Sequence, residues 1–447
     1  MGIYFIVAMR NLVQARRRTL LLAGALGFVS MLLVLLLALS QGITDTMIRS
    51  STVLYTGHVN VAGFYKAKST DAWPLVRETP ALREIVNENT PGLDYVVDRG
   101  RGWAKLISAT SSLWASMSGI DVAEEGAFLE KVQLAEEREY KEDGRAEVVG
   151  DIRHLAEPGT IFLFAAQAKR LGVVIGDMLT LSAETEGGTS NLMDVRLVAV
   201  AKDIGFMSNW NAYLSKATLR QMYQLSDDVS GAVLVYLKDP AQATEVMEHL
   251  RDVFLARGYT LMDHQPASFW MKFETVAGED WVGQKLDLTT WEDEVGMMKW
   301  AISALDSISV FLVAIMLFII VIGIANTMFI AVRERTNEIG TLRAIGMRRG
   351  QVLRMVLLEA GILGAFATTV GSALGALLAM MLNALSVPIS IEALRAILMS
   401  DTLQLSVQPS QILGAIVTFT LITALAALWP AVRAARLVPV TAIHHAE

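Results

Sequence analysis

The chain has 447 residues, of which 53% are hydrophobic and 19% are charged, and its formal net charge at pH 7 is −7. This composition is too apolar for an ordinary soluble protein and too polar for a chain that lies wholly within a membrane, so it predicts a mixed architecture. The absence of cysteine excludes disulfides, thiolate metal sites and cysteine nucleophiles. The acidic balance gives no evidence of nucleic-acid binding, and we expect no nucleic acid among the partners.

Residues 1–18 predict a cytoplasmic interfacial helix, because apolar side chains share one face and arginines follow at its end. The alternative is an unstructured basic tail that only sets orientation. Four apolar runs are each long enough to cross the hydrocarbon core, which takes about 20 helical residues. The predicted transmembrane helices cover residues 19–42, 301–332, 355–385 and 409–432. The first run has no clear cleavage site at its end and is interpreted as an uncleaved signal anchor.

Residues 43–300 form the predicted exported domain, an α+β unit with two subdomains, of which the second spans roughly residues 160–262. Segments 93–97 and 104–107 are expected to be separate strands, and 123–140 a charged helix. The other strands are expected at 113–118, 178–182, 195–201 and 232–237, and the other helices at 80–87, 165–171, 216–223 and 240–257. The fold class is therefore a membrane protein with four transmembrane α-helices and a large α+β periplasmic domain inserted between helices 1 and 2.

Aromatic residues are concentrated between residues 264 and 300, where Trp270, Trp281, Trp291 and Trp300 accompany two phenylalanines. They either sit at the membrane interface, where aromatic side chains are enriched, or form a groove for an apolar cargo. The interfacial interpretation is preferred for Trp300, and both remain open for the rest.

Basic residues fix the predicted topology. Residues 42–300 contain 25 basic and 38 acidic side chains, whereas the rest of the chain is net positive and its arginines lie at the ends of the apolar runs. By the positive-inside rule, both termini are cytoplasmic and the large domain is outside. Residues 333–354 then form a cytoplasmic coupling loop or helix, 386–408 a short periplasmic loop and 433–447 a cytoplasmic tail.

Motifs for catalysis are missing from the sequence. No G-x-x-x-x-G-K-[ST] phosphate loop and no G-x-S-x-G occurs, and the histidines do not have metal-ligand spacing. We therefore expect no catalytic residue, no metal and no cofactor bound by this chain. Asp306 and Glu359 lie at membrane edges, where an ionisable group suggests a function such as proton relay, although hydration or pairing is the preferred explanation. Gly371 and Gly375 form a small-xxx-small pair that permits close helix packing.

Four segments in chain order resemble one family. They are M-R-N-L-V-Q-A-R-R-R-T-L before the first span, A-A-Q-A-K-R-L-G-V-V-I-G-D-M-L-T-L in the exported domain, E-R-T-N-E-I-G-T-L-R-A-I-G-M-R-R-G-Q-V after the second span, and P-A-V-R-A-A-R-L-V-P-V-T-A-I at the C-terminus. With the order of spans, they are similar to the permease subunits of the FtsX/MacB-like ABC transporter superfamily. The length and the D-L-T-T-W-E-D-E stretch resemble the LolC/LolE lipoprotein-releasing branch most.

The resemblance implies a non-enzymatic, mechanotransmitting permease in the bacterial inner membrane. Its partners would be a cytoplasmic ABC ATPase dimer on separate chains, which binds ATP and Mg, and a second permease subunit, either identical or a paralogue. The loop after the second span would dock on the ATPase through the positions that match the family: Glu338, Ile339, Gly340, Arg343, Ala344, Ile345 and Gly346.

Lipoprotein release is the first expectation for the function. The alternatives are MacB-like efflux of drugs or peptides with a periplasmic adaptor, and FtsX-like signalling that activates a periplasmic hydrolase. Lipoprotein, lipid, peptide and drug all remain open as substrates. The sequence does not select among them.

Overall fold

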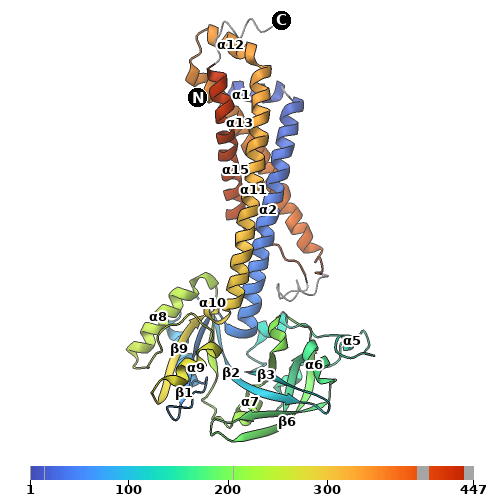
Figure 1. The fold of residues 1–447 in the computed structure, drawn as a ribbon, viewed down its shortest axis with the longest axis vertical. Coiled ribbons are helices and arrows are strands. Elements are labelled where there is room, and N and C mark those ends of the chain that lie inside the picture. The colour runs from blue at the N-terminus through green and yellow to red at the C-terminus, as the bar shows by residue number, and fades with distance from the viewer. Residues whose placement is uncertain (1, 15, 205, 390–401, 437–447) are drawn as a thin grey trace. The chain divides into compact units, whose positions relative to one another are not determined.

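The computed structural model describes residues 2–14, 16–204, 206–389 and 402–436. Contacts divide the chain into two compact units. A helical unit contains residues 1–45, 302–388 and 402–447, and an α+β unit contains residues 46–301 (Figure 1). The fold class predicted from the sequence is confirmed.

Four stretches of helix in the described residues are long and apolar enough to cross a membrane: Thr19–Thr56, Ile302–Glu334, Arg349–Ala384 and Pro409–Ala435. They correspond to α2 (Arg16–Ser51) with the π-helical turn η1 (Thr52–Thr56), α11 (Gly296–Glu334), α13 (Arg349–Ala384), and α15 (Pro409–Ala426) with α16 (Leu428–Ala435). The helical unit also contains α1 (Gly2–Gln14), which precedes α2, and the short α12 (Thr336–Ala344) between α11 and α13.

Helices α2 and α11 are longer than a bilayer requires. They have 36 and 39 residues. At 1.5 Å per residue they are about 54 and 58 Å long, against a hydrocarbon core of about 30 Å. On the side of the exported domain, α2 ends at Ser51 instead of the predicted residue 42, and α11 begins at Gly296 instead of the predicted residue 301.

A four-stranded antiparallel sheet forms the first part of the α+β unit. Its order is β2 (Leu93–Ile107), β8 (Ala232–Leu237), β1 (Val59–Lys66) and β9 (Gly283–Thr290). Helix α3 (Thr79–Asn89) connects β1 to β2, and α8 (Ala243–Ala256) connects β8 to β9. This is a split β-α-β arrangement, with the other elements inserted between β2 and β8.

The inserted elements close a second sheet into a six-stranded ring. Its order is β2, β3 (Ser112–Ile120), β7 (Asn211–Ser215), β4 (Thr160–Phe164), β6 (Ser190–Ala201) and β5 (Met178–Glu184), and β5 pairs with β2 again. Alternate apolar residues of these strands face the interior of the ring. With apolar residues of α6 (Ala165–Leu171) and α7 (Lys216–Tyr223), they form one buried core. Strand β2 belongs to both sheets, because its first half pairs with β8 and its second half with β3 and β5.

This arrangement differs from two expectations. The second subdomain is the ring, which begins within β2, instead of a block at 160–262. The helix expected at 123–140 is broken into α4 (Gly126–Lys131) and α5 (Glu137–Tyr140), because the amide of Ala135 donates to Val200 and draws the intervening residues to the edge of β6.

The aromatic stretch is divided between interior and surface. Phe269 and Phe273 of α9 (Phe269–Gly278) pack with Trp281 around Phe64, and Trp291 at the start of α10 (Trp291–Glu294) is buried. Trp270 and Trp300 are exposed. Much of the stretch is therefore part of the domain core instead of a groove.

Candidate functional site

Helix α12 is defined by clear start and stop signals. The hydroxyl of Thr336 donates to the carbonyls of Val332 and Arg333 at the end of α11, where the chain turns. At the other end, Gly346 has a φ of 110°, which glycine adopts without steric cost. The amide of Gly346 donates to Arg343 and that of Met347 to Leu342, the paired bonds of a Schellman motif.

Helix α13 starts immediately after this stop. The side chain of Gln351 accepts a hydrogen bond of 2.7 Å from the backbone amide of Arg348, which satisfies a donor at the helix N-terminus. The sequence G-M-R-R-G-Q thus ends one helix and begins the next within a few residues. The short connection restricts the positions that α12 can take relative to α13.

An ion pair fixes the first residues of α12 to α13. Arg335 Nη1 lies 3.0 Å from a carboxylate oxygen of Glu359, whose side chain is 6% exposed, and Arg335 Nε lies 2.9 Å from Glu338. Burial opposes the charge on Arg335, but the two carboxylates raise its pKa overall. Glu359 is therefore a paired carboxylate, which supports the structural explanation for this intramembrane acid over proton relay.

The inner face of α12 is apolar and packs on the helices beside it. Ile339 forms a small buried cluster with Val352 of α13 and with Ala434 and Ala435 of α16. The contact joins α12 to the ends of two spans. Ile339 therefore packs α12 directly against α13 and α16.

The seven predicted docking residues divide between two faces of α12 and its C-terminal turn. Ile339 and Gly340 are buried, and Arg343 is half-buried. The exposed residues are Glu338, Ala344, Ile345 and Gly346, and Ile345 is 80% exposed. Ile345 is the most exposed of the large apolar side chains in the described part of the chain. The exposed set thus combines a large apolar side chain, Ile345, with the carboxylate of Glu338.

Gly371 and Gly375 lie where α13 crosses α2. A Cβ atom on Gly371 would be 2.1 Å from the carbonyl oxygen of Gly27, and one on Gly375 would be 2.9 Å from that of Met31. The hydroxyl of Ser30 bonds Ser372 at 2.9 Å across the same contact. The glycines allow the two backbones to touch, and the serines satisfy each other.

Asp306 has an exposed side chain on α11, three residues before Ser309, whose hydroxyl bonds Ser40 of α2. It is not part of any intramembrane polar network among the described residues. Within that part of the chain, no group of three or more histidine and carboxylate side chains has a geometry that would hold a metal ion.

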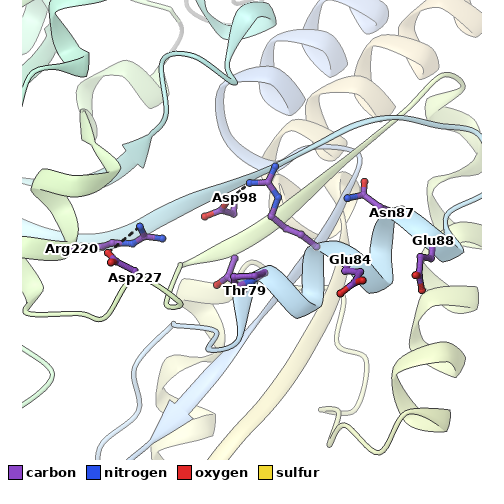
Figure 2. A pocket seen from close by; sticks show the side chains of 9 residues that line it. Thr79, Glu84, Asn87, Glu88, Asp98, Arg220 and Asp227 are labelled. Carbon is purple, nitrogen blue, oxygen red and sulfur yellow. Dashed lines mark hydrogen bonds and ion pairs between the residues drawn. The ribbon is translucent and has the colours of Figure 1, made fainter.

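A charged cleft of about 540 Å³ lies beside α3 in the exported domain (Figure 2). Glu84, Asn87 and Glu88 project from α3 along one wall, and Asp98 of β2 lies on the other side. Arg83 pairs with Asp98 at 2.7 Å, and Arg220 pairs with Asp227 at 3.7 Å. Such a charged lining does not suit the acyl chain of a lipid.

Arg335 is not among the residues predicted for the site. It lies next to the predicted site and was counted only as one of several arginines that set topology. The signal was nevertheless present, because Glu359 is an isolated acid close to an apolar span and such an acid needs a cation within reach. The separation of 24 residues across a turn concealed the pair.

Two family models match the chain. Residues 310–439 match the FtsX-like permease C-terminal model, and residues 19–253 match the MacB-like periplasmic core domain model. The macrolide export ATP-binding/permease protein MacB of Neisseria meningitidis serogroup A is 27% identical over 352 residues, which cover 76% of this chain and 45% of that protein. An uncharacterised ABC transporter permease of Methanocaldococcus jannaschii is 39% identical over 93 residues, 20% of this chain and 23% of that one.

Among solved structures, the periplasmic region of MacB from Actinobacillus actinomycetemcomitans is similar, with 12% identity and a TM-score of 0.31. The match covers 56% of this chain and 98% of that one. The chain spans about half the length of the MacB proteins it matches.

Proposed function

Because this chain belongs to the FtsX/MacB-like superfamily of ABC transporter permeases, we propose that it couples ATP hydrolysis to work done by its exported domain. The ATP would be hydrolysed by an ABC ATPase outside these 447 residues, since the sequence has no phosphate loop. Binding and hydrolysis would move α12, and the spans would transmit the movement. The chain itself would hold no catalytic group.

One observation carries this proposal: α12 is tied firmly to the spans on one face and offers unpartnered apolar surface on the other. The ties are the Arg335–Glu359 ion pair and the packing of Ile339. The free surface is centred on Ile345. An exposed aliphatic side chain can anchor an interface when a pocket on the partner buries it.

The experiment is Ile345→Asp in the full chain, reconstituted in lipid nanodiscs with the ABC ATPase that co-purifies with it. The side chain is exposed, so folding should be unchanged, whereas a charge in an apolar pocket should weaken docking by about 2–4 kcal/mol, or roughly 30- to 1000-fold. Titration of the ATPase against the nanodisc complex measures this loss.

Leu255→Asp is the matched control. Leu255 is also an exposed apolar residue, at 54%, but it lies on α8 of the exported domain. It should leave ATPase affinity unchanged. Equal affinities for Ile345→Asp and wild type would refute the assignment of this surface.

For the assembly, we propose two permease subunits with two ATPase subunits, in a bacterial inner membrane with both termini in the cytoplasm. The permease family supports the ATPase partnership and the dimer, and the arginine-rich stretch of residues 333–354, which the positive-inside rule assigns to the cytoplasm, supports the topology. Labelling cysteines introduced singly at residues 255 and 345 with a membrane-impermeant maleimide tests the topology, since the chain has no native cysteine. Only residue 255 should react in spheroplasts.

For the cargo, we propose that the complex exports a drug or a peptide. We prefer this function to lipoprotein release. The support is that MacB proteins named for macrolide export match most of the chain, and that the cleft beside α3 has a charged lining. Hydroxyl groups of the spans bond across helix contacts, Ser30 with Ser372 and Ser40 with Ser309, which suits a transporter whose substrate does not cross the helical bundle. Macrolide resistance conferred by the complex would support efflux, and a lipoprotein or a peptidoglycan hydrolase co-purified with the outer domain would favour the alternatives.

A further inference from the structure

The exported end of α2 has an unusual termination inside the α+β unit. After Ser51 the helix widens into the π-helical turn η1, and Gly57, with a φ of 63°, turns the chain into β1. The amide of Gly57 donates to Thr52. The last carbonyls of a helix have no amide partners within it and carry partial negative charge. Those of Val53 and Leu54 therefore need other donors in this buried place.

Arg99 of β2 supplies two of the donors. Its Nη1 donates to the carbonyl of Leu54 at 2.6 Å and its Nη2 to that of Val53 at 2.7 Å. The rest of the guanidinium binds Glu125, with Nε and Nη2 at 2.6 and 2.7 Å from its two carboxylate oxygens. Arg99 and Glu125 are both 3% exposed. The pair is neutral overall, so the cation can remain buried against the helix end.

Two tyrosines complete the same contact. The hydroxyl of Tyr213 on β7 donates to the carbonyl of Leu54, and that of Tyr236 on β8 donates to the carbonyl of Thr52, each at 3.0 Å. Both rings are buried. Side chains from β2, β7 and β8, which belong to the two different sheets of the domain, thus converge on one helix end.

The beginning of α11 is held close to this point in the same unit. Trp291 of α10, just before α11, donates its backbone amide to the carbonyl of His58 at 3.1 Å, and β1 pairs with β9 from Val59↔Thr290 onward. Both long helices therefore join the domain at neighbouring ends of paired strands. Bonds that hold the end of α2 to these strands would transmit a force along that helix to both sheets.

We propose that Arg99, Tyr213 and Tyr236 form a joint that fastens the end of α2 to the exported domain and transmits the movement of this helix to it. They are positioning residues. The inference rests on the proposed function, because it assumes that α2 is moved by ATP-driven changes at α12. The proposal requires that the end of α2 stays bound to the domain during ATP-driven movement only while these side chains keep their hydrogen bonds to its carbonyls.

The test is hydrogen–deuterium exchange of the full chain with its ATPase, without nucleotide and trapped with ATP and vanadate. In the wild type, exchange of residues 52–58 should be the same in both states. In the double variant Tyr213→Phe, Tyr236→Phe, which lacks two hydrogen bonds, this segment should exchange about tenfold faster than in the wild type in the trapped state, and clearly less so without nucleotide.

Tyr223→Phe is the matched control. Its buried hydroxyl donates to the carbonyl of Trp103 at 2.8 Å, in the same domain but away from α2. It loses the same kind of bond and should show no nucleotide-dependent exchange at residues 52–58. Arg99→Lys, which cannot span two carbonyls and a carboxylate, should behave like the double tyrosine variant if it folds.

Failure of the joint and failure of the proposed function give different results. If Ile345→Asp weakens ATPase docking but the double tyrosine variant shows no nucleotide-dependent exchange, the joint is refuted and the proposed function stands. If Ile345→Asp leaves ATPase affinity unchanged, the docking surface that carries the proposed function is refuted first. If residues 52–58 of the double variant exchange equally fast in both nucleotide states, the tyrosines have only a structural role. This result would also refute the proposed joint.

Discussion

Replacing Gly371 with alanine should force α13 away from α2. The added Cβ atom would lie 2.1 Å from the carbonyl oxygen of Gly27 and 2.7 Å from its carbonyl carbon. Ordinary contact begins near 3.4 Å, so the two helices must separate by more than about 1 Å. The obstructing atoms belong to a helix backbone and have no rotamer to change.

The size of the effect follows from this contact. Overpacking of a tight contact costs about 1–3 kcal/mol. Separation also stretches the Ser30–Ser372 hydrogen bond, now 2.9 Å, and the bond from Ser30 to the carbonyl of Thr368, now 3.2 Å. Each such bond between membrane helices contributes about 0.6 kcal/mol. We expect a total destabilisation of roughly 2–4 kcal/mol.

Gly361→Ala is the control for this prediction. Gly361 is on the same helix, but a Cβ atom there would meet nothing within 4 Å. Alanine is the better helix former, so this variant should be as stable as wild type or slightly more stable. Unfolding in detergent, followed by tryptophan fluorescence, compares the two. If Gly371→Ala unfolds at the same midpoint as Gly361→Ala, the close contact between α2 and α13 is not as described.

Two further predictions concern charged groups. Glu359→Gln or Arg335→Gln alone should destabilise the protein by about 1–3 kcal/mol, because each removes the Arg335–Glu359 ion pair, and the double variant should recover part of the loss in a thermal unfolding assay; additive losses would contradict the pairing. Burial lowers the pKa of His58, whose Nδ1 accepts a hydrogen bond of 2.8 Å from the amide of Leu237. The neutral side chain therefore stabilises the fold above the unfolded pKa of 6.5, and this contribution is lost as the pH falls through the lower pKa of the folded state. The melting temperature should therefore drop between pH 7.5 and pH 5, less in His58→Gln, and an identical drop in that variant would show that His58 is not responsible.

The elements with local signals were predictable from the sequence. The expected helices 165–171 and 216–223 and the expected strand 232–237 have the bounds of α6, α7 and β8. Gly172 ends α6 with a φ of 66°, and the side chain of Ser215 caps α7. These signals lie within a few residues of the element they define.

The long strand β2 was not predicted, because its middle reads as a loop. Residues 99–103 are R-G-R-G-W, in which glycine and arginine disfavour a buried strand. The reason for the glycines lies far away in the sequence. A Cβ atom on Gly102 would be 2.3 Å from the ring of Tyr223, and one on Gly100 would be 2.8 Å from Leu219. Helix α7 packs directly on the backbone of β2 there, and only glycine leaves room for it.

The position of α12 was predictable from the sequence, but the orientation of its faces was not. The arginines and glycines located α12, and the Schellman motif follows from G-M-R-R-G. Which residues face inward depends on α16, about 90 residues further along the chain, whose Ala434 and Ala435 cover Ile339. The cleft beside α3 and the ties of Arg99 likewise arise from contacts between distant segments.

The position of β1 has a consequence for biogenesis. Residues 59–62 pair with residues 232–235, so the first strand of the domain emerges long before its neighbour β8 exists. At 5–20 residues per second, synthesis of the intervening chain takes roughly 10–35 s. The ring elements between β2 and β8 are contiguous and can fold during that interval, while β1 waits with an open edge. The four-stranded sheet of β2, β8, β1 and β9 is complete only when β9 has been synthesised. Because β9 immediately precedes α11, this sheet is completed only as the second span enters the membrane.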